Sequence, residues 1–262
     1  MEINHCNLKT KPIPNLSEAF VRKQDYRNHP IDFQHQLHNE AVADIKDYGL
    51  AGDNYYHRTD NPPYNQQIPN SIPDLFLRLG IIKRLQTVDN ELKKFGLELY
   101  FFDCYRPIEV QNFFHDIWVP NRLKSDHPDW PQEKILEETC KYWAKGAPRS
   151  SEVDPCSPPP HSTGAACDLT IRKTSGEHLF MGGIFDDVSI ISNTDFFEME
   201  SQKRTLSFSE IEALQNRRLL YHLMTNAGFA NNPTEWWHYS HGDQMWAKLT
   251  NQQFAFYSKI VI

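Results

Sequence analysis

Apolar side chains recur at every third or fourth position between Leu75 and Phe95, a spacing that predicts an amphipathic helix. The members of this stripe are Leu75, Leu79, Ile82, Leu85, Val88, Leu92 and Phe95. Gly96 comes next and predicts the end of the helix, because glycine readily adopts the left-handed conformation found at helix ends. The largely apolar run 97–103 then predicts a buried strand.

Further helices and strands follow without a regular βαβ rhythm. Helices are predicted over about 108–117, near 131–145, and from a capping box at Ser209–Glu212 to a stop at Gly228. Strands are predicted up to Thr170 and Ile171, over 235–239 and over 254–262. Five prolines within 148–160 predict a rigid loop between the helices and the later strands. This mixed order favours an α+β fold over a doubly wound sheet.

The composition is typical of a folded domain. Hydrophobic residues make up 39% of the 262 residues, which is enough to bury a core. Acidic residues number 34 against 27 basic ones, and no basic cluster interrupts this balance, so neither a nucleic-acid nor a membrane partner is expected. The sequence has no long apolar run and no apparent secretory signal, and it does not specify an oligomeric state.

The five cysteines are scattered and contain no CxxC pair. An odd, dispersed set of this kind is typical of reduced thiols, so we expect a cytoplasmic protein. Cys167 stands beside Asp168, but neighbouring residues of a strand point to opposite faces. We therefore expect Cys167 to be a small buried residue rather than a nucleophile.

The first 40 residues are polar and contain His5, His29, His35 and His38. They could form a histidine-rich metal tract, but an N-terminal extension that packs on the main domain is the simpler interpretation. We therefore divide the chain into an extension, 1–40, and a main domain, 41–262.

Two separated segments carry the residue types that a catalytic metal needs. His161 and Asp168 stand at the two ends of one segment, and Glu235 and His238 belong to the other. Two imidazoles and one carboxylate would leave a fourth zinc position for water, and a neighbouring glutamate could accept a proton from that water. Gly164 permits a tight turn between His161 and Asp168.

A regular strand would place Glu235 and His238 on opposite faces, because they are three residues apart. Both can reach one metal only if the backbone between them is irregular. Pro233 lies just upstream and is compatible with an irregular strand start.

These segments resemble the zinc D-alanyl-D-alanine dipeptidases of the VanX type. The run 161–168 matches the HxxGxAxD motif and 235–238 matches ExWH, while 105–107 is similar to the family's YRP segment. Residues 181–186 are similar to MGxxFD, and Gly228–Phe229 to the Gly-Phe that precedes ExWH. The five segments occur in the family's order, which is more specific than any one of them.

The resemblance implies a compact single domain of the hedgehog/D,D-peptidase type, with a central, mostly antiparallel sheet flanked by helices. It also implies one zinc ion per chain and a small dipeptide substrate, D-Ala-D-Ala or a relative. By this resemblance the zinc ligands are His161, Asp168 and His238 and the general base is Glu235. Arg106 would stabilise the oxyanion, and Asp186 would bind the substrate ammonium group.

Pro159 departs from the family pattern, which has serine at this position, two residues before the first histidine ligand. Proline has neither a hydroxyl nor an amide donor for a substrate carboxylate. Two alternatives to a dipeptidase remain at this point. One is a D,D- or L,D-carboxypeptidase acting on peptidoglycan peptides, and the other is a non-catalytic zinc-binding domain of the same fold. A binding domain would need neither Glu235 nor Arg106.

Overall fold

A five-stranded sheet lies at the centre of the computed structural model, which describes residues 5–143 and 145–262. The strand order is β2 (Ala51–Gly52), β4 (Leu97–Asp103), β5 (Ala166–Lys173), β7 (His238–Ser240) and β6 (Ala230–Asn231). Strand β2 is parallel to β4, and all the other neighbours are antiparallel. The predicted α+β fold with a mostly antiparallel central sheet is confirmed.

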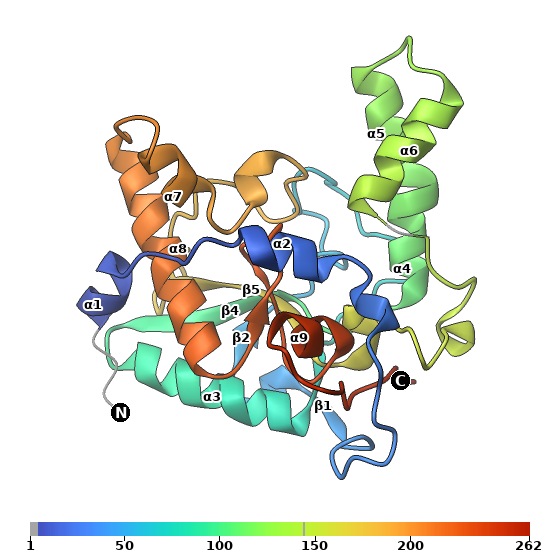
Figure 1. Cartoon of the computed structure of the whole chain (residues 1–262), viewed down its shortest axis with the longest axis horizontal. Helices are drawn as coiled ribbons and strands as arrows, with labels where there is room; N and C mark the ends of the chain where they lie inside the picture. The colour runs from blue at the N-terminus through green and yellow to red at the C-terminus, as the bar shows by residue number, and fades with distance from the viewer. Residues whose placement is uncertain (1–4, 144) are drawn as a thin grey trace.

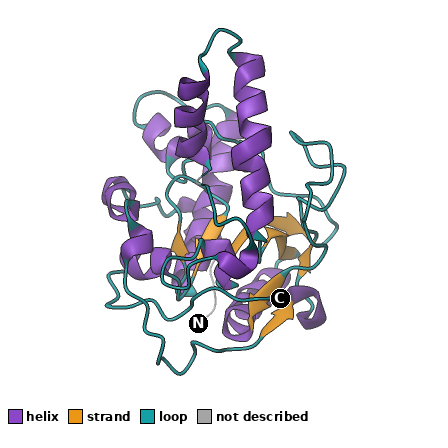
Figure 2. Ribbon diagram, turned by 90° about the vertical axis from the view of Figure 1, so that its right-hand side faces the viewer, coloured by secondary structure: helices purple, strands orange, loops and turns teal. Residues whose placement is uncertain are grey.

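Helices surround this sheet (Figure 1). They are α1 (His5–Thr10), α2 (Ser17–Lys23), α3 (Leu79–Lys93), α4 (Ile108–Phe113), α5 (Val119–Asp126), α6 (Gln132–Tyr142), α7 (Phe196–Ser201), α8 (Phe208–Asn226) and α9 (Gln244–Leu249). The adjacent α5 and α6 project together away from the sheet, as Figures 1 and 2 show. Within the described ranges, no helix has both the length and the apolar character needed to span a bilayer.

Helix α3 packs its predicted apolar stripe against β4. Ile82, Leu85 and Leu92 are fully buried in the main core cluster, together with Leu99 and Phe101 of the strand. Burial of each such side chain contributes roughly 1.5–3 kcal/mol relative to its exposed state. The helix and strand therefore form a rigid base for the loop that follows β4.

The predicted helix began too early in the chain. Residues Phe76–Arg78 form a strand, β3, which pairs with β1 (Val42–Asp44) in a separate two-stranded sheet. The buried guanidinium of Arg78 donates hydrogen bonds to the carbonyl groups of Thr163 and Ser258, which fix this extended segment. These partners are distant in the sequence, so local periodicity could not reveal the strand.

The start of α8 and the end of the chain also differ from the predictions. The capping box joins Ser207 and Glu210, so its predicted position at Ser209–Glu212 was wrong by two residues. The stop at Gly228 is confirmed by its left-handed φ of 90°. The predicted strand over 254–262 does not form. Its amides bond instead to loop carbonyls, such as that of Ala255 to Pro30.

The outcomes differ among the two middle helices and the late strand near Glu235. The helix begun by α4 continues through a π-helical turn, η3 (Phe114–Trp118), into α5. Helix α6 forms where it was predicted. The late strand begins only at His238, because turns occupy the residues before it.

The N-terminal segment runs across the helices that border the sheet (Figure 1). Helix α1 contacts α8, while α2 and the short turn η1 (Tyr26–Asn28) contact α9. Among the described residues, His29, His35 and His38 belong to no cluster of metal-ligating groups, and the side chain of His5 lies outside the described set. The metal-tract alternative therefore receives no support.

Candidate metal centre and active site

Three acidic or imidazole side chains share one row of the central sheet. Asp168 of β5 is opposite Asp103 of β4 on one side and His238 of β7 on the other. Side chains at paired positions of adjacent strands point to the same face. The strand register therefore brings together residues that are far apart in the sequence.

His161 reaches the same place from a short helical turn, η5 (Pro160–Thr163). Gly164 ends this turn with a φ of 66°, a left-handed conformation suited to glycine. Nδ1 of His161 lies 2.7 Å from the carbonyl oxygen of Cys104 and must donate to it, since a carbonyl only accepts. The lone pair of Nε2 in the neutral ring is therefore directed at the cluster.

The three predicted ligands converge. Nδ1 of His238 lies 3.0 Å from Nε2 of His161 and 3.0 Å from Oδ1 of Asp168. One ligand atom from each residue lies within 4.8 Å of the other two, and all three residues are buried. Two imidazoles and one carboxylate are a donor set used by catalytic zinc sites that keep an open position. The residues present therefore fit a single divalent cation.

Glu235 stands beside this cluster in an irregular segment. Its amide bonds to the carbonyl of Asn232, and its own carbonyl accepts from the amide of His238, so turns precede β7. Oε2 of Glu235 lies 3.6 Å from Nδ1 of His238, and the side chain remains 35% exposed. The irregular backbone that the spacing required is present, and it leaves a carboxylate accessible beside the cluster.

Arg106 links the cluster to Asp103, a residue that sequence reasoning did not assign to the site. Its Nε donates to Asp103 at 2.7 Å and its Nη2 to Asp168 at 2.9 Å. The guanidinium also lies over the rings of Tyr56 and Trp143. This arrangement fixes a buried cation next to a candidate metal ligand.

The charges around Asp168 favour its ionised form. Burial alone would raise the pKa of its carboxyl, but the adjacent imidazoles of His161 and His238 hold that pKa well below the ordinary value. An ionised carboxylate is the form that ligates a metal. Asp103 differs, because burial raises its pKa despite the nearby Arg106.

Asp186 lies at another part of the same cavity, in contact with two tyrosines. The hydroxyls of Tyr56 and Tyr64 donate to its Oδ2 at 2.5 and 2.8 Å. Burial raises the pKa of Asp186 to about 7, even though Arg106 and the Tyr56 hydrogen bond lower it. Asp186 is therefore not a solvated loop acid. No sequence motif indicated either tyrosine.

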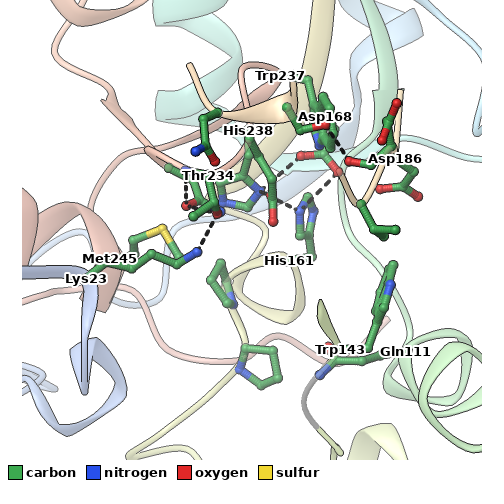
Figure 3. A pocket seen from close by; sticks show the side chains of 18 of the residues that line it. Lys23, Gln111, Trp143, His161, Asp168, Asp186, Thr234, Trp237, His238 and Met245 are labelled. Atoms are coloured by element: carbon green, nitrogen blue, oxygen red, sulfur yellow. Dashed lines mark hydrogen bonds and ion pairs between the residues drawn. The ribbon is translucent and has the colours of Figure 1, made fainter. Parts of the chain in front are cut away.

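A cavity of about 480 Å³ opens over these groups (Figure 3). Its wall includes Arg106, His161, Asp168, Asp186, Glu235 and His238. Pro159 and Trp237 also line it, as does Lys23 from α2, which sequence reasoning did not single out. This volume is in the range of pockets that bind small molecules.

Cys167 lies outside this chemistry. It is fully buried in the core and is paired with Tyr239 in the sheet. Burial raises the pKa of its thiol well above the ordinary value, so the thiol stays protonated and unreactive. The prediction of a small buried residue is confirmed. The described thiols of Cys104, Cys140, Cys156 and Cys167 are free.

Comparison with known proteins identifies the family. A family model described as D-ala-D-ala dipeptidase, peptidase M15, matches residues 49–260. The chain belongs to this family. It is therefore an enzyme of the dipeptidase type, and the alternative of a non-catalytic binding domain is disfavoured.

Curated members of the D-ala-D-ala dipeptidase family are similar to this chain. The D-alanyl-D-alanine dipeptidase of Synechocystis sp. is 36% identical over 194 residues, covering 70% of this chain and 76% of the relative. That of Enterococcus faecium is 33% identical over 147 residues and covers 55% and 62%, respectively. That of Escherichia coli is 28% identical over 145 residues, or 55% of either chain.

Proposed function

We propose that the protein is a zinc dipeptidase that hydrolyses D-Ala-D-Ala or a closely related dipeptide. The observation that carries this proposal is the convergence of His161, Asp168 and His238 in a cavity that Glu235 also lines. The names of the curated relatives supply the substrate class. In this proposal residues 41–262 form the peptidase domain and residues 1–40 an extension packed on it. A cytoplasmic location stays a prediction.

His161, Asp168 and His238 would hold the zinc ion. Bound there, zinc would act as a Lewis acid and bring the pKa of a water molecule close to neutrality. The hydrogen bond from His161 to the carbonyl of Cys104 keeps the ring oriented, and Arg106 does the same for Asp168. These two ligands are therefore held in place by the protein itself.

Glu235 is the proposed general base. Its exposed carboxylate can accept a proton from the attacking water and return it to the nitrogen of the leaving amine. Arg106 is a fixed cation at the cavity wall and can stabilise the negative charge that develops on the scissile carbonyl oxygen. Its contacts with Asp103 and Asp168 restrict its movement, so little reorganisation is needed during the reaction.

Asp186 is the proposed partner of the substrate ammonium group. Its Oδ2 accepts from Tyr56 and Tyr64, which leaves Oδ1 and the remaining lone pairs to receive a charged N–H donor. An acylated amine brings no charge to this carboxylate. This difference favours a free dipeptide over the interior of a longer peptide, and thus a dipeptidase over a carboxypeptidase.

The experiment compares D-Ala-D-Ala with N-acetyl-D-Ala-D-Ala and with a peptidoglycan stem peptide. We expect kcat/KM for the free dipeptide to exceed that for the acetylated one by roughly 100-fold, because a charge-assisted bond is lost. Equal or better cleavage of the longer substrates would instead identify a carboxypeptidase. L-Ala-L-Ala measures the stereochemical preference in the same assay.

A further inference from the structure

Helix α2 places a lysine in the wall of the active-site cavity. Lys23 is the last residue of this helix, and its Nζ donates to Oγ1 of Thr234 at 2.7 Å. Thr234 directly precedes Glu235, so the ammonium group stands beside the proposed general base. The family model begins to match only at residue 49, and α2 therefore lies outside the matched region.

The ammonium group of Lys23 can donate more hydrogen bonds than the one that Thr234 accepts. A lysine carries three N–H donors, and Thr234 accepts one of them. In the described part of the chain, no carboxylate lies within ion-pair distance of this Nζ. Burial lowers the pKa of Lys23, whereas the nearby Glu235 raises it. The ammonium group is thus partly desolvated, which strengthens its attraction for an anion.

The other cations in the described wall of the cavity are already engaged. Arg106 bridges Asp103 and Asp168, and Arg27 donates through Nε and Nη2 to the carbonyl oxygen of Ser157. Pro159 has no amide or hydroxyl hydrogen to offer an anion. Lys23 is the cation of this wall that stands beside the proposed general base, since its partner Thr234 directly precedes Glu235.

The position of Lys23 matches the charge pattern of a dipeptide. In Figure 3, Lys23 and Asp186 lie on opposite sides of the cluster formed by His161, Asp168 and His238. A free dipeptide has an ammonium group at one end, a carboxylate at the other and its scissile carbonyl between them. An acid, the cluster of three candidate ligands and a cation occur in the matching order across the cavity.

We propose that Lys23 binds the C-terminal carboxylate of the dipeptide substrate, an inference that rests on the proposed dipeptidase function. The N-terminal extension then completes the active site. The enzyme would recognise a dipeptide at both ends, with Asp186 at the ammonium group and Lys23 at the carboxylate.

The test measures hydrolysis of D-Ala-D-Ala and of its C-terminal amide by the wild-type protein and by Lys23→Gln. We expect the wild type to prefer the acid, and Lys23→Gln to lower kcat/KM for the acid by roughly 10- to 100-fold, mainly through KM. The kcat/KM for the amide should change by less than about 3-fold, because the amide has no carboxylate charge for Lys23 to bind. The preference for the acid should therefore largely disappear.

Two further variants separate substrate binding from a structural role. Arg22→Gln removes the preceding cation of α2, which pairs with Glu18 at the surface. This variant should hydrolyse the acid and the amide at wild-type rates. Lys23→Arg keeps the charge and should retain a preference for the acid. Thermal melting of each variant reports whether the fold is intact.

An equal loss of activity on the acid and the amide would overturn the proposal, because Lys23 would then act only by holding the loop of Thr234. Unchanged kinetics in Lys23→Gln would overturn it as well. Failure of the wild type to hydrolyse D-Ala-D-Ala or any closely related free dipeptide would be a different result. It would refute the proposed function, and with it this inference.

Discussion

Asp168 and His238 are opposite each other on the antiparallel strands β5 and β7, with Nδ1 of His238 3.0 Å from Oδ1 of Asp168. A shift of one residue in this register would turn one of the two side chains to the other face of the sheet. The buried strands thus determine the geometry of the proposed metal site. His161 then joins this pair from a turn held by the carbonyl of Cys104.

Asp168 should be required for metal binding. Asp168→Asn removes the negative ligand with little change in shape, and we expect bound zinc to fall from about one ion per chain to nearly none. Asp187→Asn is the matched control, because Asp187 lines the same cavity without joining the ligand cluster. Elemental analysis after dialysis measures the zinc content of both variants. Full zinc occupancy in Asp168→Asn would remove Asp168 from the ligand set.

Glu235→Gln should separate metal binding from catalysis. The variant keeps the size of the side chain but cannot accept a proton, so we expect kcat to fall by about 10²–10⁴-fold. Zinc content should stay at the wild-type level, since Glu235 is not one of the three clustered ligands. Turnover close to wild type would exclude Glu235 as the general base.

Arg106→Lys should lower kcat and should destabilise the fold less than Arg106→Ala does. Lysine keeps the positive charge but cannot reproduce the two hydrogen bonds to Asp103 and Asp168, so a loss of roughly 10²–10³-fold is expected. Arg106→Ala should also destabilise the protein by about 3–5 kcal/mol, because it removes the buried cation that Asp103 and Asp168 share. Steady-state kinetics and chemical denaturation distinguish the two effects. Unchanged kcat in Arg106→Lys would contradict a role at the oxyanion.

The pH dependence of substrate capture should depend on Asp186. Burial raises the pKa of this carboxyl to about 7, so its charge is lost as the pH falls through that value. Since kcat/KM reflects the ionisation of the free enzyme, we expect it to decline on the acid side of the pH profile. The midpoint of this decline should lie at pH 7 or lower, because a bound metal cation would lower the pKa of Asp186. In Asp186→Asn this limb should be absent, and KM should be higher than in the wild type wherever the wild-type carboxylate is charged. The same acid limb in the variant would assign it to another group.

Part of this site could be predicted because its chemistry is concentrated in short segments. His161 and Asp168 belong to one run of the sequence, and Glu235 and His238 to another, so the residue types and spacings were visible. The structure adds what the spacing left open, namely the turn that lets Glu235 and His238 lie near one point. Helix α3 and strand β4 were equally visible, because the helix has a periodic apolar stripe and the strand is a largely apolar run.

The remaining contacts depend on tertiary structure that local patterns do not encode. Asp103 enters the site through its register with Asp168, while Tyr56 and Tyr64 reach Asp186 from a distant loop. Lys23 arrives from a helix that precedes the matched region. The strand β3 was missed for the same reason, since its partner β1 lies elsewhere in the chain.

The most direct test of the central claim joins metal analysis to activity in one preparation. The purified chain should contain about one zinc ion per chain and hydrolyse D-Ala-D-Ala to D-alanine. Removal of the metal with a chelator should abolish hydrolysis, and addition of one equivalent of zinc should restore it. Full activity in a metal-free preparation would contradict the proposal that His161, Asp168 and His238 act by holding a catalytic zinc ion.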